Sequence, residues 1–472
     1  MALRLFRASP PAGLVLATLA ALAVSACAIG PDYKRPAVDT GVVFKEAEGW
    51  KLANPSDALD KGDWWTVFND PYLDDLEKQV EVSNQNLIRA EAAYTQARAL
   101  VDENQALIFP NVTGSGAATR SKSIGSSSAA SQFNGRINAA WDIDVWGRIR
   151  RQIEASRNQA RASEADIANA KLSAQITLAN DYVQLRAQDE AKRLLDATIA
   201  AYSKTLEITR NKFNAGVSAK SQVLTAQSTL QSAQAQAADL ARTRAVLEHA
   251  IAVLTGRPPS RLTIAPLANF ALVAPEIPVG LPSSLLERRP DVASSERVMA
   301  AANAQIGVNL AGFFPDLSLS GADGQASSSL SRFFSAAGNS WSIGASVAQT
   351  IFDAGATQGR VNAARAVYTQ DVAAYRQTVL TALQQVEDAI AAVRVLEVEE
   401  KLRVEASKEA DQAEAIANNQ FQAGTVDYTT LVVAQATALS ARTTAVQTTT
   451  LRLQSTINLI SALGGGWKRP AS

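Results

Sequence analysis

The chain has 472 residues with 45 basic and 45 acidic side chains, so its formal net charge is zero and gives no sign of a nucleic-acid partner. Its single Cys excludes an internal disulfide, and its single His leaves little scope for a metal centre or a His-based catalyst. No nucleophile–base pair, metal cluster or phosphate-binding loop stands out, so we expect neither an enzyme nor a cofactor site.

Residues 1–26 have the pattern of a secretory signal peptide. Arg4 and Arg7 precede the apolar run GLVLATLAALAV, and small residues follow it. An apolar run of about 12 residues is shorter than a membrane span, which needs about 20. The following Cys27 completes the sequence VSAC, which resembles the bacterial lipoprotein box, where the Cys is lipidated and becomes the mature N-terminus. The alternative is an ordinary signal peptide followed by a chance Cys. With Ala28 after the Cys, the resemblance implies delivery to the outer membrane.

Residues 27–70 are interpreted as a lipid-anchored, extended N-terminal arm. At its end, Asp70 and Pro71 form a helix-start signal, with Asp70 as the N-cap and Pro71 at the first helical position. Apolar residues at three- and four-residue spacings then predict a helix over 72–108, which Pro110 ends.

Residues 135–145 alternate between apolar and polar side chains, so that Ile137 and Trp141 point to one side and Arg136 to the other. A period of two residues predicts a strand. An apolar side that ends near Trp141 and Trp146 fits a transmembrane barrel strand, with lipid outside, water inside and aromatic residues at the membrane interface. A half-buried strand of a soluble sheet is the alternative.

The placement of Gly predicts two very long helical hairpins. Neither Gly nor Pro occurs between Gly147 and Gly216, and only Gly359 interrupts the run from Gly355 to Gly424. Because Gly costs about 1 kcal/mol and Pro about 3 kcal/mol inside a helix, each run predicts a helix about 100 Å long. A seven-residue recurrence in the first run predicts a left-handed supercoil, at Ile153, Ala160, Ile167 and Ala174.

The turn that ends the first run, FNAGVS at 213–218, returns as FQAGTV at 421–426. Gly216 and Gly424 are interpreted as the residues that end the two long helices. Ser218 is expected to cap the helix that follows the first turn.

The second half of the chain repeats the first. Phe109-Pro110-Asn111 returns as Phe314-Pro315-Asp316, and a second alternating stretch begins at Trp341, which is expected at the membrane interface like Trp141 and Trp146. Each half therefore predicts a helix, two strands, a long helix and a shorter helix. The expected parts are a first repeat over 71–256, a Pro-rich crossover over 257–290, a second repeat over 291–464 and a C-terminal tail over 465–472.

Four strands per chain cannot close a membrane barrel, and an open edge in lipid would leave backbone groups unpaired. Closure therefore requires more than one chain. Two chains would supply 8 strands and three would supply 12, and the sequence does not choose between these numbers.

The motifs taken together resemble the outer-membrane efflux factors of the TolC and OprM type, in particular the lipoprotein branch. The resemblance covers nearly the whole chain. It rests on AIGPDYKRP, DWWTVFNDPYLDDL, WDIDVWGRIRR, LLERRPDVASSERVMAAANAQIG, FFPDLSLSG, IFDAG and the paired FxAG turns. It implies a mainly α chain with membrane β structure and an internal two-fold repeat. Three such chains would form a long α-helical barrel continued by a 12-stranded transmembrane β-barrel in the outer membrane of a Gram-negative bacterium.

The resemblance also implies partners and a function. The expected function is the passive exit duct of a tripartite export system, which docks a periplasmic adaptor and an inner-membrane transporter, usually an RND-type one. The alternative is a lipid-anchored periplasmic coiled-coil adaptor or scaffold. The residues implied in adaptor contact lie in the two turns, at Gly216, Val217, Ser218, Gly424, Thr425 and Val426.

Asp427 follows the second turn and has two interpretations. Relatives narrow the periplasmic mouth with acidic rings from this turn, which implies that Asp427 constricts the aperture. In this chain the Asp is shifted by one place relative to Tyr428, which weakens that assignment. The alternative is that Asp427 is only the N-cap of the following helix.

Overall fold

The computed structural model describes residues 28–37, 63–125, 128–267, 274–275, 289–335 and 338–465. The predicted signal peptide, Cys27, and large parts of the predicted arm, crossover and tail lie outside the described residues. The described residues fall into two compact units. Unit 1 holds those of Met1–Ala37, Ala93–Glu164 and Ser294–Gln377, and unit 2 holds those of Val38–Ala92, Ala165–Ala293 and Thr378–Ser472.

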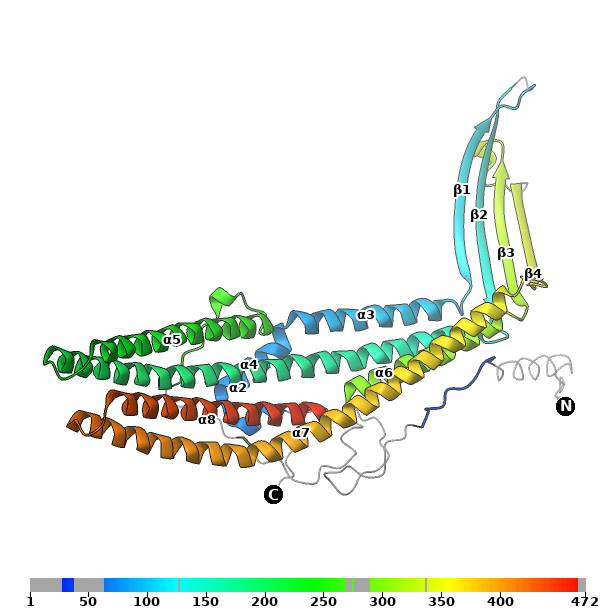
Figure 1. The fold of residues 1–472 in the computed structure, drawn as a ribbon. Coiled ribbons are helices and arrows are strands. Elements are labelled where there is room, and N and C mark those ends of the chain that lie inside the picture. The colour runs from blue at the N-terminus through cyan, green and yellow to red at the C-terminus, as the bar shows by residue number, and fades with distance from the viewer. Residues whose placement is uncertain are drawn as a thin grey trace, which may run out of the picture. The chain divides into compact units, whose positions relative to one another are not determined.

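Unit 1 contains one antiparallel sheet of four strands in the order β1-β2-β3-β4 (Figure 1). These are β1 (Asn111–Ser121), β2 (Ala130–Ile143), β3 (Asp316–Ser327) and β4 (Asn339–Ala348). The central pair β2 and β3 joins the two halves of the sequence, with Ile143 opposite Leu317. The prediction of four strands is confirmed. The outer edges of β1 and β4 have no neighbouring strand among the described residues, and every residue of both strands is exposed.

Four helices contribute segments to unit 1: α3 (Gln85–Ala106), α4 (Arg148–Asn214), α6 (Pro290–Ala311) and α7 (Ala356–Ala423). The segment 28–37, here called the strap, packs against them. Arg151 of α4 donates to the Asp32 carboxylate at 2.8 Å, and Asn303 of α6 donates to the Pro31 carbonyl at 2.8 Å. The short 3-10 helix η4 (Leu330–Arg332) lies between β3 and β4.

Unit 2 begins with the 3-10 helix η1 (Trp64–Phe68) and α2 (Pro71–Ser83). The predicted N-cap is confirmed, because the Asp70 carboxylate accepts from the backbone N–H groups of Tyr72 and Leu73. The single helix predicted over 72–108 is wrong. The chain leaves the helical conformation at Asn84, whose side-chain oxygen caps α3 by accepting from the N–H groups of Asn86 and Leu87.

The long helices form two hairpins. The first joins α4, of 67 residues, to α5 (Lys220–Leu254), and the second joins α7, of 68 residues, to α8 (Tyr428–Ala462). The shorter helices α5 and α8 both have 35 residues, so the repeat in the sequence is also a repeat in helix length.

The main core of unit 2 joins both hairpins to α2 and to the crossover. Its fully buried members include Trp65, Leu76, Tyr182, Ile251 and Leu453. After η2 (Pro259–Arg261), the crossover is held by its own apolar side chains, since Leu262 and Ile264 are buried in the same cluster.

The seven-residue pattern predicted for α4 holds only in part. Ile153 and Ala160 are buried, but Ile167 and Ala174 are partly exposed. Further along α4 the buried residues include Ala165, Leu172 and Ala179. These three have the same seven-residue spacing but lie on a different side of the helix. An ordinary α-helix drifts by about 20° per heptad relative to a strict seven-residue repeat, so one line cannot stay buried over the whole helix.

Candidate functional site

The two long helices end in the same backbone motif. In the first turn, Gly216 has φ 78°, its N–H donates to the Phe213 carbonyl at 2.9 Å, and the Val217 N–H donates to the Lys212 carbonyl at 2.9 Å. In the second turn, Gly424 has φ 77° and the two corresponding bonds measure 3.1 and 2.9 Å. This pair of bonds is the Schellman motif, which requires a left-handed residue after the helix. The prediction that Gly216 and Gly424 end the long helices is confirmed.

The starts of the following helices differ. Asp427 is the N-cap of α8, with its carboxylate accepting from the Thr430 N–H at 2.9 Å and the Thr430 hydroxyl at 2.7 Å. The backbone N–H bond, followed by the hydroxyl bond, lowers the pKa of the exposed Asp427 carboxyl. Asp427 is therefore an N-cap, and this role leaves its carboxylate exposed at the turn.

The prediction that Ser218 caps the helix after the first turn is wrong. The N-cap of α5 is Ala219, which has no side chain to accept a hydrogen bond. The Ser218 hydroxyl instead donates to the Gln222 side chain at 2.6 Å. For Ser218 to be the N-cap, α5 would have to begin at Ala219. It begins one residue later, at Lys220.

The two turns lie at the same end of unit 2 and contact each other (Figure 1). The Lys212 ammonium donates to the Phe421 carbonyl at 2.9 Å and lies 3.9 Å from the centre of the Phe421 ring. Phe421 in turn packs in a small core with Tyr428 and Leu431. A cation from the first hairpin is thus bound to the helix end of the second.

The second candidate region is the sheet of unit 1, whose end nearest the helices carries large exposed apolar side chains. We call this set the helix-side rim. Its members come from the segments just before β1 and β3 and just after β4: Phe109, Phe313, Phe314, Ile351 and Phe352, which are 38–90% exposed. The paired Phe-Pro motifs are visible in the sequence, but sequence reasoning used them only to align the two halves and did not single them out as exposed aromatic residues.

The predicted aromatic residues divide between the two ends of the sheet. Trp141 and Trp146 lie near the helix-side rim, where their indole N–H groups donate to the carbonyls of Ile108 and Pro315 at 2.7 and 2.8 Å. Trp146 also packs on Phe314, with ring centres 4.9 Å apart. Trp341 lies toward the other end, opposite Asp323, and is 74% exposed.

Trp341 lies further along the sheet from the helices than the helix-side rim does. Trp341 is opposite Asp323, while Ala348, beside the helix-side rim, is opposite Asp316. The seven-residue step between these positions spans about 23 Å along β3, which a barrel tilt of about 35–45° reduces to roughly 16–19 Å along the membrane normal. The apolar band of a membrane barrel is about 25 Å tall and is bounded by aromatic residues at both levels.

No group of three or more His, Cys, Asp or Glu side chains in the described ranges could hold a metal ion. Among the same residues, no helix combines the length and apolar character of a membrane span.

Comparison with known proteins gives a family match over most of the chain. The model of the family described as "Outer membrane efflux protein" matches residues 76–257 and 281–465. The two matched ranges overlap the ranges 71–256 and 291–464 that the sequence predicts as repeats.

Individual relatives match over almost their whole length. The "Probable efflux pump outer membrane protein TtgC" of Pseudomonas putida is 27% identical over 464 residues, which cover 95% of this chain and 96% of that protein. The "Cation efflux system protein CusC" of Escherichia coli is 28% identical, with 95% and 98% covered. The solved structure of the outer-membrane channel OprN superimposes with a TM-score of 0.83 at 30% identity, over 93% of this chain and all of that one.

Proposed function

The chain belongs to the outer membrane efflux protein family, and from this premise we propose that it is the outer-membrane exit duct of a tripartite efflux system. In this role it passively conducts solutes that an inner-membrane transporter has delivered. One relative named as an efflux pump outer membrane protein and one named as a cation efflux system protein match almost end to end, which supports this assignment.

The observation that carries the proposal is the four-stranded sheet of unit 1. Both of its edges are unpaired among the described residues, and its outer strands β1 and β4 are exposed along their whole length. A sheet with open edges is stable in lipid only if further strands pair with those edges. We propose a homotrimer, in which β4 of one chain pairs with β1 of the next and closes a 12-stranded barrel.

The aromatic residues fit the two boundaries of such a barrel. We propose that Trp141, Trp146 and the helix-side rim lie at the periplasmic boundary of the membrane, and that Trp341 lies within or near the opposite one. Indole and phenyl rings are favoured at both boundaries because they combine an apolar body with a polar or polarisable edge.

The turns support a docking function. We propose that Gly216, Val217 and Ser218 of the first turn, with Gly424, Thr425 and Val426 of the second, contact the periplasmic adaptor. Val217 is 74% exposed and carries an apolar side chain without burial at the tip of unit 2. We further propose that Asp427 of each subunit narrows the aperture, since its capping bonds leave the carboxylate exposed.

We also propose that Cys27 is lipidated and anchors the chain in the outer membrane. The strap that begins at Ala28 is bonded to α4 and α6, so the protein holds the chain firmly just after the proposed anchor. The partners that complete the system are a periplasmic adaptor and an inner-membrane transporter, of the RND type by family resemblance.

The test is to purify the full-length, membrane-extracted protein and measure its oligomeric state and conductance. An exit duct migrates as an oligomer in unheated gels and as a monomer after heating, and it conducts ions across planar bilayers. A lipid-anchored scaffold or adaptor does neither. A non-conducting monomer would therefore overturn the duct and favour the scaffold.

A further inference from the structure

Helix α6 presents two different faces within unit 1. Glu296 and Asn303 are seven residues apart and hold the strap: Glu296 accepts from the Tyr33 hydroxyl at 2.5 Å, and Asn303 donates to the Pro31 carbonyl at 2.8 Å. Val298, Gln305 and Asn309 are roughly 120–160° around the helix from Asn303. These three residues line a groove, so the strap and the groove lie on opposite sides of α6.

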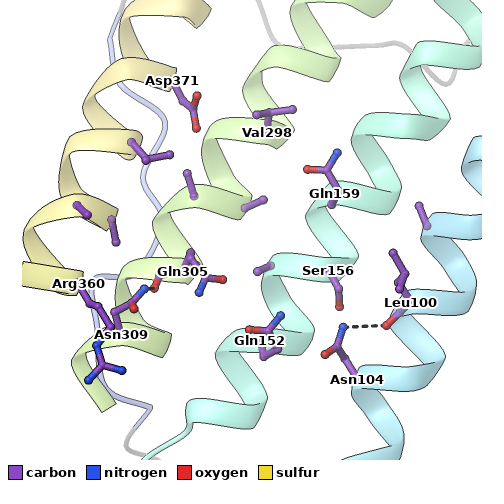
Figure 2. Close-up of a pocket in the computed structure, with 17 residues that line it drawn as sticks. Leu100, Asn104, Gln152, Ser156, Gln159, Val298, Gln305, Asn309, Arg360 and Asp371 are labelled. Atoms are coloured by element: carbon purple, nitrogen blue, oxygen red, sulfur yellow. Dashed lines mark hydrogen bonds between the residues drawn. The ribbon is translucent and has the colours of Figure 1, made fainter. Parts of the chain in front are cut away.

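The groove is a cavity of about 710 Å³ formed by α3, α4, α6 and α7. Figure 2 shows amide and hydroxyl groups from three of these helices converging on it. The polar neutral side chains that line it are Asn104, Gln152, Ser156, Gln159, Gln305 and Asn309. Most of the remaining lining residues are alanines. The groove therefore presents neutral hydrogen-bonding groups among small apolar side chains, and it carries little charge.

Only two ionised side chains line the groove in the part of the chain that the structure describes. Both belong to α7, with Arg360 near its start and Asp371 eleven residues further along (Figure 2). Arg360 is exposed, and its guanidinium donates to the Thr357 hydroxyl at 3.0 Å, which fixes its position at the end of the groove.

The position of the strap indicates which side of the helices faces outward. Its first described residue follows Cys27, the proposed lipid anchor, and a lipid chain must enter the membrane from the outside of a duct. The strap side is therefore the outer side, and the groove on the other side of α6 faces the interior. This step rests on the proposed function.

We propose that the groove is a solute-contacting stretch of the duct wall, and that Arg360 and Asp371 are the residues that set its charge selectivity. The amides and alanines suit uncharged and zwitterionic small molecules. Such molecules can form hydrogen bonds with the groove, and no cluster of charged side chains would retain them by electrostatic attraction. Arg360 attracts anions at one level of the duct, and Asp371 attracts cations at the other. In a trimer each level carries three copies of the same charge.

The first test is the cation-to-anion permeability ratio of the full-length protein in planar bilayers, from the reversal potential in a KCl gradient at low ionic strength. Arg360→Gln removes one cation per subunit and is expected to raise this ratio by at least about two-fold, because even one unit charge about 8 Å from an ion in water shifts its energy by roughly RT, in opposite directions for cations and anions. The matched control is Arg365→Gln on the same helix. Arg365 is exposed, does not line the groove and is about 140° around α7 from Arg360, so its variant is expected to leave the ratio unchanged.

The second variant tests the opposite sign. Asp371→Asn is expected to lower the permeability ratio by a similar factor, while Asp102→Asn, an exposed carboxylate of α3 outside the groove, is expected to leave it unchanged. Circular dichroism and the oligomer band in unheated gels verify that each variant is assembled.

The outcomes separate the two proposals. If the parent protein does not conduct, the duct itself is overturned. If the parent conducts and Arg360→Gln and Asp371→Asn behave like their controls, the duct stands and the groove is not its charge-selective wall. The assignment is supported if the two groove variants shift the permeability ratio in opposite directions and the two control variants leave it unchanged.

Discussion

The two FxAG turns have the same backbone and opposite side-chain environments. Phe213 and Phe421 occupy the same place in the repeated motif, three residues before Gly216 and Gly424, and the two helix ends have matching hydrogen bonds. Yet Phe213 is 39% exposed and Phe421 is 3% exposed. Lys212, Tyr428 and Leu431 surround the second ring, whereas the first ring faces outward.

This difference shows what a sequence repeat specifies and what it leaves open. The local chemistry of Phe-x-Ala-Gly determines how each long helix ends, but neighbouring helices determine what each turn exposes. The second turn is packed and carries the acidic cap Asp427, while the first exposes Phe213 and Val217. We therefore expect the first turn to supply more apolar contact to an adaptor and the second to control the aperture.

The largest expected effect comes from removing the two rings. Phe421→Ala leaves a cavity in the core around Tyr428 and should lower the free energy of unfolding by about 3–5 kcal/mol. Phe213→Ala removes a ring that is only partly covered and should lower it by less, about 1 kcal/mol. Denaturant titration in detergent, followed by circular dichroism, measures both.

The same pair tests the assignment of the turns to different roles. Phe213→Ala is expected to affect stability less than Phe421→Ala does and to weaken adaptor binding, because part of the Phe213 ring is exposed at the turn. Equal destabilisation by the two variants would contradict the difference in packing.

The second prediction concerns what the turns share. Gly216→Ala and Gly424→Ala each force a side chain into the left-handed region and should cost about 1–2 kcal/mol. No atom lies within 4 Å of a Cβ placed at either position, so the cost is conformational and should be equal in both turns. The midpoints of thermal unfolding of the two variants measure these costs. A clearly larger loss of stability in one variant would show that the turns also differ in backbone strain.

Much of the fold was predictable because its signals are local. The absence of Gly and Pro between Gly147 and Gly216 indicated one helix, and α4 is 67 residues long. The Asp70-Pro71 pair indicated a helix start, and Asp70 is the N-cap. The break at Asn84 was missed because a capping Asn inside an otherwise helical pattern looks like an ordinary polar position.

The candidate site was less predictable because it depends on contacts across the sequence. The burial of Phe421 requires Lys212, which is 209 positions away in the chain. The groove residues lie on four helices and have no common motif. The helix-side rim was present in the sequence as Phe-Pro pairs, but only the strand register brings them to one end of the sheet.

The third prediction concerns the contact between the turns. Lys212→Met removes an ammonium that both donates to the Phe421 carbonyl and lies over its ring, and should cost about 0.5–1.5 kcal/mol. Gln420 occupies the equivalent position in the second hairpin and is exposed, so Gln420→Met should be neutral. The two midpoints of thermal unfolding decide this, and equal shifts would mean that the Lys contact adds nothing to the stability of the second turn.

The smallest expected effect comes from exchanging the helix caps. Asp427→Ala removes the N-cap of α8 and should lower the midpoint of thermal unfolding slightly, whereas Ala219→Asp supplies a cap that α5 lacks and should raise it. Because the hydrogen bonds to Thr430 lower the pKa of Asp427, its stabilisation is present above the unfolded-state pKa, which is about 3.9 for Asp, and is lost as the pH falls through the folded-state value. The difference between parent and Asp427→Ala should therefore disappear in acid.

Asp427→Asn separates capping from aperture control. Asn is as good an N-cap as Asp and retains an oxygen for the Thr430 N–H, so this variant should keep the stability of the parent protein at neutral pH. It removes only the charge. If the three carboxylates narrow the aperture, Asp427→Asn should raise the leak conductance of the isolated channel in bilayers even though the helix is still capped. If conductance rises only in Asp427→Ala, the residue acts through the helix start, and the acidic character of the second turn has no part in closing the mouth.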